Sequence, residues 1–360
     1  CEGMTLLRIT NSPRDYAWGS TDLIPSLLGK DPDDKPQAEI WFGTHPSSES
    51  TVLDQVGGKL SERVGQLSFL VKILAAAKPL SIQAHPTKQW AAKRFAEGYP
   101  GYTDANHKPE LIAAVSEFRA LCGFRKQEDI TADLTALAKA DQIFEPWLSA
   151  LGTDGLEGAT SWALNQNSQV AQRLAESAGQ TSRAALIAEI NENFPNDVGL
   201  LVSLLLNYVE LAPGQALYLP AGNIHAYLSG LGIEVMATSD NVLRGGLTPK
   251  QIDIPELISI ADFRELLNPV AVQKQLTQGL TEYQTGEKEF QVYRVEPSGS
   301  NLLVDLRLQG KAIAVCVAGE ITITTSKDES LALRPGEACY FEAANYFSVL
   351  GSGTGYLAFG

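Results

Sequence analysis

Residues 214–225, Gly214-Gln-Ala-Leu-Tyr-Leu-Pro220-Ala-Gly222-Asn-Ile-His225, contain the pattern that decides the predicted fold. A glycine suited to a tight turn precedes a short apolar run, and a Pro–Gly turn follows it. His225 then begins the next strand, and we expect its side chain to face the inside of a small barrel. The alternative is a Pro–Gly hairpin with a structural histidine in the core, because a single motif match is only a hypothesis.

The spacing G-x5-P-x-G-x2-H resembles the second motif of the cupin family, with Ser229 where that motif usually ends in asparagine. The resemblance implies a jelly-roll barrel. The flanking sequence agrees, because runs such as Ala38–Phe42, Ile224–Leu228 and Gly232–Ala237 are apolar, short and bounded by turn residues, as strands are. The C-terminal part of the chain also predicts strands throughout, among them Leu302–Leu308.

Between about residues 126 and 194 the composition changes to Ala, Leu, Glu and Gln, and apolar residues recur with helical spacing. The predicted helices are Thr131–Ala140, Ser168–Ala178, Ser182–Asn193 and Asp197–Tyr208. We therefore predict a mainly β protein with an α insertion: a cupin (jelly-roll) catalytic barrel, a helical insertion, and a second, C-terminal β domain of jelly-roll type. The predicted boundaries are 4–125 and 197–255 for the catalytic barrel, 126–196 for the insertion and 256–360 for the C-terminal domain.

The composition excludes several classes of partner. The formal net charge is -14, so nucleic acid and anionic membranes would be repelled. A phosphorylated substrate would therefore need a local basic cluster. The N-terminal residues lack a basic segment followed by an apolar run, so we expect no signal peptide and a cytoplasmic protein. The cysteines lack metal-type spacing and are expected to be reduced thiols: Cys1, Cys122, Cys316 and Cys339.

Polar residues alternate along the segment Pro79–Pro86. On a strand, Ser81, Gln83 and His85 would share one face, because alternate side chains point the same way. Three polar side chains on one face are costly in a core unless they bind something. The segment therefore predicts ligands for a metal ion, with a polar barrel lining that holds no metal as the alternative.

A second polar segment, Asp104–Glu110, supplies a carboxylate and a cation. If a strand begins near Asn106, then Lys108 and Glu110 face inward with it, while His107 leans to the other side. The alternative is an exposed charged loop. Together the segments offer Gln83, His85, Glu110 and His225, a set that suits Zn²⁺ with an open position, although Fe²⁺ and Mn²⁺ also accept such donors.

Several segments together resemble the type I mannose-6-phosphate isomerase family in order and spacing. They are Tyr16–Gly19, Ala38–Pro46, Lys78–Pro86, Asn106–Leu111, Leu121–Phe124, Pro220–Tyr227 and Ser239–Lys250. The resemblance implies one zinc ion per chain, with the family's ligands at Gln83, His85, Glu110 and His225. It also implies a small-molecule sugar phosphate substrate and the interconversion of D-mannose 6-phosphate and D-fructose 6-phosphate by C1–C2 proton transfer through a cis-enediol.

That chemistry needs a base near C1 and C2 and an anchor for the phosphate. Lys108 and Glu234 are both candidates for the base, and the sequence does not choose between them. A neighbouring dication would depress the pKa of Lys108, and Glu234 interrupts an apolar strand, where a carboxylate is costly without a role.

The remaining candidates have auxiliary roles. Tyr227 shares the strand face of His225 and is expected to contact the sugar, and His107 is assigned to ring opening. Asp240 is expected to orient Arg244. The predicted phosphate ligands are Ser81, Arg244 and Lys250.

Two other functions remain open at this stage. One is a non-catalytic cupin that binds metal and sugar, which would not need Lys108, Glu234 and Arg244 together. The other is a cupin oxygenase with Fe²⁺, a class that favours more histidine at the metal. A monomer is the working expectation, although the sequence leaves oligomeric state open.

Overall fold

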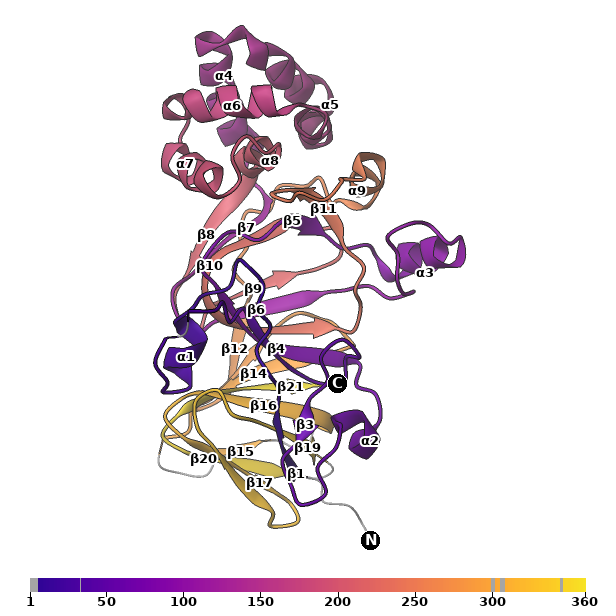
Figure 1. Cartoon of the computed structure of the whole chain (residues 1–360), viewed down its shortest axis with the longest axis vertical. Helices are drawn as coiled ribbons and strands as arrows, with labels where there is room; N and C mark the ends of the chain where they lie inside the picture. Colours follow the sequence, from indigo (N-terminus) through magenta and orange to yellow (C-terminus); the bar gives the residue numbers. More distant parts are fainter. Residues whose placement is uncertain (1–5, 33, 299–301, 305–307, 344–345) are drawn as a thin grey trace.

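The computed structural model describes residues 6–32, 34–298, 302–304, 308–343 and 346–360. Three layers follow one another along the longest axis (Figure 1). Helices lie at one end, a nine-stranded sheet forms the middle, and an eight-stranded and a four-stranded sheet form the other end. The predicted class, mainly β with an α insertion, a cupin barrel and a second β domain, is confirmed.

The middle layer is organised around one long strand, β10 (His225–Ala237). Its first part pairs with β5 (Ile82–Ala84) and β7 (Phe118–Phe124), and its second part pairs with β4 (Phe69–Ala76) and β6 (Glu110–Ala114). The other strands of this sheet are β2 (Glu39–Phe42), β8 (Leu206–Leu211), β9 (Ala216–Leu219) and β11 (Leu243–Gly246). The two strands predicted at Ile224–Leu228 and Gly232–Ala237 are therefore one.

The end layer is a sandwich of two sheets. The eight-stranded sheet contains β1 (Leu6–Thr10), β3 (Thr51–Val52), β12 (Gln273–Thr277), β13 (Leu280–Tyr283), β14 (Gln291–Val295), β16 (Gly310–Ala318), β19 (Ala338–Ala343) and β21 (Thr354–Phe359). The four-stranded sheet contains β15 (Leu302–Val304), β17 (Ile321–Thr325), β18 (Ser330–Leu333) and β20 (Phe347–Gly351). The core between the two sheets contains residues such as Ile321, Phe341 and Phe347.

The barrel and the sandwich share an apolar interface. Ile73 and Ile233 of the barrel belong to the same buried cluster as Ile313 and Tyr340 of the eight-stranded sheet. The first strand crosses this boundary, because β1 pairs with β19. The division into four segments stays a prediction, and residues 4 and 5 of its first segment lie outside the described residues.

The helical layer covers the opposite side of the barrel. It consists of α4 (Gln127–Ala140), α5 (Glu145–Leu164), α6 (Ser168–Glu176), α7 (Ala184–Asn193) and α8 (Gly199–Leu205), with short 3₁₀ turns at Gln142–Phe144 and Ala178–Gln180. Trp147 and Leu204 pack in one cluster with Ile82 and Ala226 of the barrel. The helix predicted at Asp197–Tyr208 is wrong at its end, because the chain pairs with β7 from Leu206 onward.

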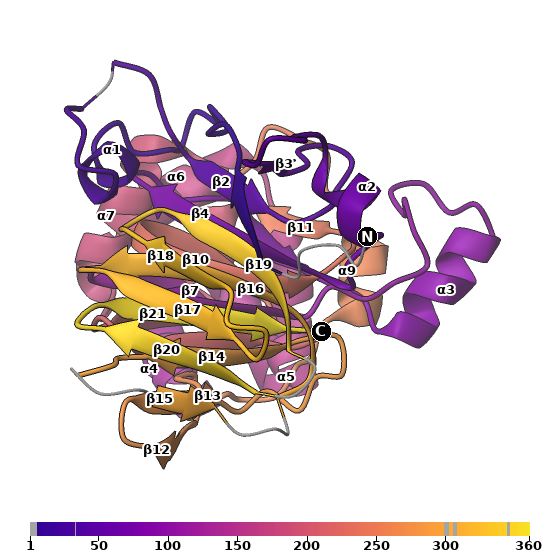
Figure 2. The ribbon, with the colours of Figure 1, turned by 90° about the horizontal axis from the view of Figure 1, so that it is seen from below.

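Short helices lie among the N-terminal strands: α1 (Leu23–Leu27), α2 (Leu60–Val64) and α3 (Lys88–Ala96). Figures 1 and 2 show α3 projecting from the side of the barrel, near α9 (Ile254–Ile260). Along the chain it lies between His85, which follows β5, and Glu110, which begins β6.

The remaining sequence predictions concern strands, thiols and membranes. The strand predicted at Leu302–Leu308 is β15 over its first three residues, and 305–307 lie outside the described part. Cys122, Cys316 and Cys339 are free thiols as predicted, whereas Cys1 lies outside the described residues. Among the helices of the described chain, none combines the length and apolar character needed to cross a membrane.

Candidate metal centre and active site

Three predicted ligands converge inside the barrel. His85 follows β5, Glu110 begins β6 and His225 begins β10. The Nε2 atoms of His85 and His225 lie 3.4 Å and 3.2 Å from the same carboxylate oxygen, Oε2 of Glu110. Each residue is at most 2% exposed.

These three facing atoms lack hydrogen-bond partners within the described part of the chain. Buried polar atoms are rarely left unsatisfied, and two imidazoles with one carboxylate are ordinary zinc ligands. The arrangement therefore fits a metal cation bound between His85, Glu110 and His225.

Backbone carbonyls orient both histidine rings. Nδ1 of His85 lies 2.9 Å from the carbonyl oxygen of Asn241, and Nδ1 of His225 lies 3.0 Å from that of Asn223. Because a carbonyl oxygen only accepts hydrogen bonds, each Nδ1 carries the hydrogen, and each Nε2 presents a lone pair to the centre.

Gln83 reaches the same region through strand register. On β5 it pairs with His225 of β10 on one side and with Arg244 of β11 on the other. Directly paired residues of antiparallel strands project to the same face of the sheet. The three side chains therefore share one face, and the role of Gln83 as a fourth ligand stays a prediction.

Lys108 lies at the edge of the metal cluster. Its Nζ is 3.1 Å from Oε1 of Glu110, the oxygen that does not face the histidines. Burial by itself would raise the pKa of Glu110, but the charge of Lys108 opposes burial and helps to hold that pKa well below its ordinary value. The carboxylate is therefore ionised, as a metal ligand must be.

His107 points away from this cluster. Its Nε2 is 2.7 Å from Oε1 of Glu289, in the loop between β13 and β14. The same oxygen lies 3.4 Å from Nζ of Lys88 in α3. The C-terminal part of the chain thus contacts the residue next to Lys108, and the ring-opening role of His107 stays a prediction.

Glu234 belongs to a second buried polar group. The Tyr227 hydroxyl donates to its Oε1 at 2.7 Å, and Nζ of Lys72 lies 3.8 Å from its Oε2. Burial, with the negative charge of Glu110 adding to it, raises the pKa of Glu234 to about 7. This carboxyl group is therefore poised to exchange a proton near neutral pH.

Sequence reasoning missed the other members of this group. Lys72 also lies 3.7 Å from Oε2 of Glu39, which accepts a hydrogen bond of 2.6 Å from the Trp41 indole. The ammonium sits 4.3 Å from the centre of the Trp41 ring. The pattern that pointed to Glu234, a charged residue within an apolar strand, also holds for Lys72, which interrupts the apolar strand Phe69–Ala76.

The guanidinium of Arg244 makes no hydrogen bond or ion pair with any described residue. It is half-buried, and burial lowers its pKa. It lines a cavity of about 800 Å³ with Ser161 of α5, Asn165 just after that helix, and Ile254 and Ile258 of α9. A half-buried cation without a protein partner is suited to bind an anion.

The other predicted partners of Arg244 are placed differently. Ser81 and Lys250 do not line this cavity. The carboxylate of Asp240 accepts from Nε2 of His45 at 3.0 Å, and in the described part of the chain it makes no contact with Arg244. The predicted role of Asp240 in orienting Arg244 is therefore without support.

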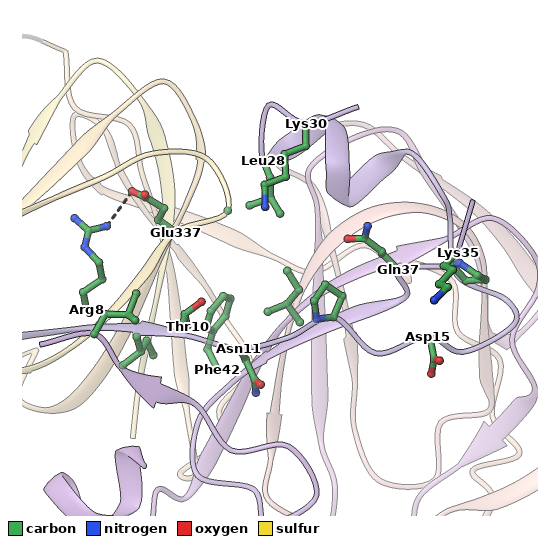
Figure 3. Close-up of a pocket in the computed structure, with 16 residues that line it drawn as sticks. Arg8, Thr10, Asn11, Asp15, Leu28, Lys30, Lys35, Gln37, Phe42 and Glu337 are labelled. Carbon is green, nitrogen blue, oxygen red and sulfur yellow. Dashed lines mark hydrogen bonds and ion pairs between the residues drawn. The ribbon is translucent and has the colours of Figure 1, made fainter. Parts of the chain in front are cut away.

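A separate cavity of about 720 Å³ lies beside the first strand (Figure 3). Arg8 and Glu337, which form an ion pair at 3.0 Å, lie on its wall. Residues predicted for metal, substrate or catalysis do not line it. It is therefore distinct from the candidate active site.

Comparisons with known proteins show which family the chain resembles. The family model for the catalytic domain of type I phosphomannose isomerase matches residues 6–127. The mannose-6-phosphate isomerase of Salmonella typhimurium is 37% identical over 394 residues, covering 98% of both chains, and that of Escherichia coli is 35% identical with the same coverage. A solved structure of mannose 6-phosphate isomerase bound with zinc and yttrium has a TM-score of 0.88 and 31% identity over 99% of both chains. The chain therefore belongs to the type I phosphomannose isomerases, a family of mannose-6-phosphate isomerase enzymes.

Proposed function

We propose that this enzyme interconverts D-mannose 6-phosphate and D-fructose 6-phosphate by moving a proton between C1 and C2 through a cis-enediol, at a site that holds one zinc ion. The observation that carries the proposal is the convergence of three buried, unsatisfied atoms from His85, Glu110 and His225. We infer the substrate from the relatives, which are named mannose-6-phosphate isomerase, and the metal from the solved relative that is bound with zinc.

Gln83, His85, Glu110 and His225 would hold the metal, with an amide oxygen, a carboxylate and two imidazoles as donors. A zinc ion bound there would stabilise negative charge that develops on the sugar oxygens. The orientation of both histidines by backbone carbonyls supports this role, because it fixes which ring nitrogen is free.

We propose that Lys108 and Glu234 are the two candidates for the group that moves the proton. Lys108 contacts the ligand Glu110 directly, whereas Glu234 lies in the adjoining buried group with Tyr227 and Lys72. Tyr227 would contact the sugar, and His107 would assist ring opening.

The phosphate would bind to Arg244, with Ser81 and Lys250 as further contacts. Arg244 shares a sheet face with Gln83, so an anion there would lie on the ligand side of the sheet. It also supplies the local positive charge that a net charge of -14 makes necessary.

We further propose that the enzyme is cytoplasmic and monomeric and that it has no nucleic acid or membrane partner. The catalytic barrel would comprise residues 4–125 and 197–255, with an insertion at 126–196 and a C-terminal β domain at 256–360.

A coupled assay with mannose 6-phosphate tests the proposal directly. Activity should disappear after chelation and return with one equivalent of zinc, and elemental analysis should find zinc in the purified protein. Protein that contains zinc but does not turn over mannose 6-phosphate would indicate a binding module. A Glu110→Ala variant that keeps both metal and activity would exclude the proposed ligand set.

A further inference from the structure

We propose that Asn241 is a positioning residue that locks the segment carrying His85 to the segment carrying Glu110. The inference rests on the proposed metal site and adds a residue outside the ligand set. It comes from two sets of hydrogen bonds: the backbone carbonyl of Asn241 binds His85, and its side chain binds the loop that leads into Glu110.

The backbone of Asn241 serves the first ligand. Its carbonyl oxygen accepts the hydrogen bond from Nδ1 of His85 at 2.9 Å. A carbonyl can orient a ligand only if it is itself fixed in place, and the residue lies just after β10, outside the strands.

The side chain of Asn241 serves the second ligand. Its Nδ2 donates to the carbonyl oxygens of Asp104 at 2.8 Å and Asn106 at 2.9 Å. It also lies 3.1 Å from Oδ1 of Asp104. Its Oδ1 accepts from the backbone N–H of Thr103 at 2.9 Å.

These hydrogen bonds order a segment that has no regular secondary structure. Residues 103–109 form neither helix nor strand, and they lead directly into Glu110. Since backbone groups of such a loop need partners to be ordered, the Asn241 amide supplies what a sheet ladder would otherwise provide. Asn241 is 0% exposed, so bulk water does not reach these hydrogen bonds.

Ser239 strengthens the same connection. Its hydroxyl donates to Oδ1 of Asp104 at 2.8 Å and accepts from the backbone N–H of Asn241 at 3.2 Å. Asn223, whose carbonyl orients His225, has no equivalent side-chain bonds among the described residues: its Oδ1 accepts one long hydrogen bond, from the Cys122 thiol at 3.7 Å. The strand pairing of β10 holds His225 instead.

The test measures zinc affinity of metal-free protein by competition with a chromophoric chelator. In Asn241→Ala the zinc dissociation constant should rise roughly 10- to 100-fold, the range typical for residues that orient metal ligands. The visible spectrum of the cobalt-substituted protein should also change, because it reports ligand geometry around the ion.

Asn207→Ala is the matched control. The Asn207 amide also donates to three backbone carbonyls, those of Cys122, Phe124 and Leu266, but it binds neither the His85 ligand nor the loop before Glu110. It should lose comparable stability to urea while its zinc affinity and cobalt spectrum stay near those of the unmodified protein. Should Asn241→Ala fail to fold, Asn241→Asp keeps the shape and the acceptor but replaces the donors with a negatively charged oxygen that faces Asp104, and it should weaken zinc binding as well.

The outcomes distinguish a failure of the positioning role of Asn241 from a failure of the proposed zinc site. Unmodified protein that binds no zinc would overturn both. Zinc binding by the unmodified protein, with equal affinity and an unchanged cobalt spectrum in the Asn241 variants, would overturn the positioning role alone.

Discussion

The hydroxyl of Tyr227 donates a hydrogen bond to Oε1 of Glu234 at 2.7 Å, although the two residues lie on one strand, β10. Residues seven apart on a regular strand would point to opposite faces. The register of β10 against β7 shifts between Tyr227 and Ser229, and this irregularity brings both side chains to the inside. The bulge therefore brings Tyr227, the predicted sugar contact, next to Glu234, a candidate base.

Glu234→Gln should reduce kcat by roughly 100-fold or more while zinc content is unchanged, since removal of a proton-transfer group typically costs this much. The glutamine oxygen can still accept from Tyr227, so the buried group should keep its shape. Steady-state kinetics and metal analysis measure both effects. Glu210→Gln is the matched control, because Glu210 accepts an equivalent 2.7 Å hydrogen bond from Tyr208 at the surface. Full activity in Glu234→Gln would leave Lys108 as the base.

Zinc should stabilise the metal-free protein against urea. At a free zinc concentration about a thousandfold above the dissociation constant, the gain should be about 4 kcal/mol, because an ion that binds only the folded state shifts the equilibrium by mass action. The His85→Ala variant should lose most of this gain. Magnesium should not replace zinc, since it disfavours imidazole ligands. An equal gain in unmodified protein and in His85→Ala would place the ion elsewhere.

Arg244→Ala should raise KM for mannose 6-phosphate by roughly 10- to 100-fold, which corresponds to the loss of one charged hydrogen-bonding group. The guanidinium lacks a described protein partner, so its removal should cost little stability. Arg264→Ala is a suitable control, because Arg264 is exposed and pairs with Asp262 at 2.6 Å. An unchanged KM in Arg244→Ala would mean that the phosphate binds at another place.

Glu256 should make folding sensitive to acid. Burial by itself would raise its pKa, but hydrogen bonds from Arg94, Trp90 and Tyr102 hold that pKa below the ordinary 4.5. A carboxyl group whose pKa is lower in the folded state stabilises the fold above its unfolded pKa, and this contribution is lost as the pH falls through the folded value.

Urea unfolding at about pH 7 and about pH 4 measures this contribution. Glu256→Gln should be less stable than the unmodified protein near neutrality, and the difference should narrow in acid. Glu97→Gln serves as a control, because Glu97 pairs with Arg94 at an exposed position. A constant difference at both pH values would contradict the assignment.

Much of the site could be predicted from the sequence because its ligands belong to motifs with local spacing. His225 follows a Pro–Gly turn, and Glu110 follows Lys108 by two residues, so local geometry already limits where they point. Glu234 could be selected because a carboxylate in an apolar strand is costly. Lys72 and Glu39 give the same signal, but their mutual contact joins distant strands and is invisible along the chain.

The sequence by itself determined the class of fold, the alternation of strand and helical regions, and the donors available to a metal, because periodicity and residue chemistry are local properties. Only the tertiary structure decided that β10 is one strand with a bulge, that Glu289 reaches His107 from the C-terminal part, and that Asn241 connects two ligand segments. Each of these depends on pairing between residues far apart in the chain, and such pairing is fixed by packing of the whole barrel rather than by any short segment.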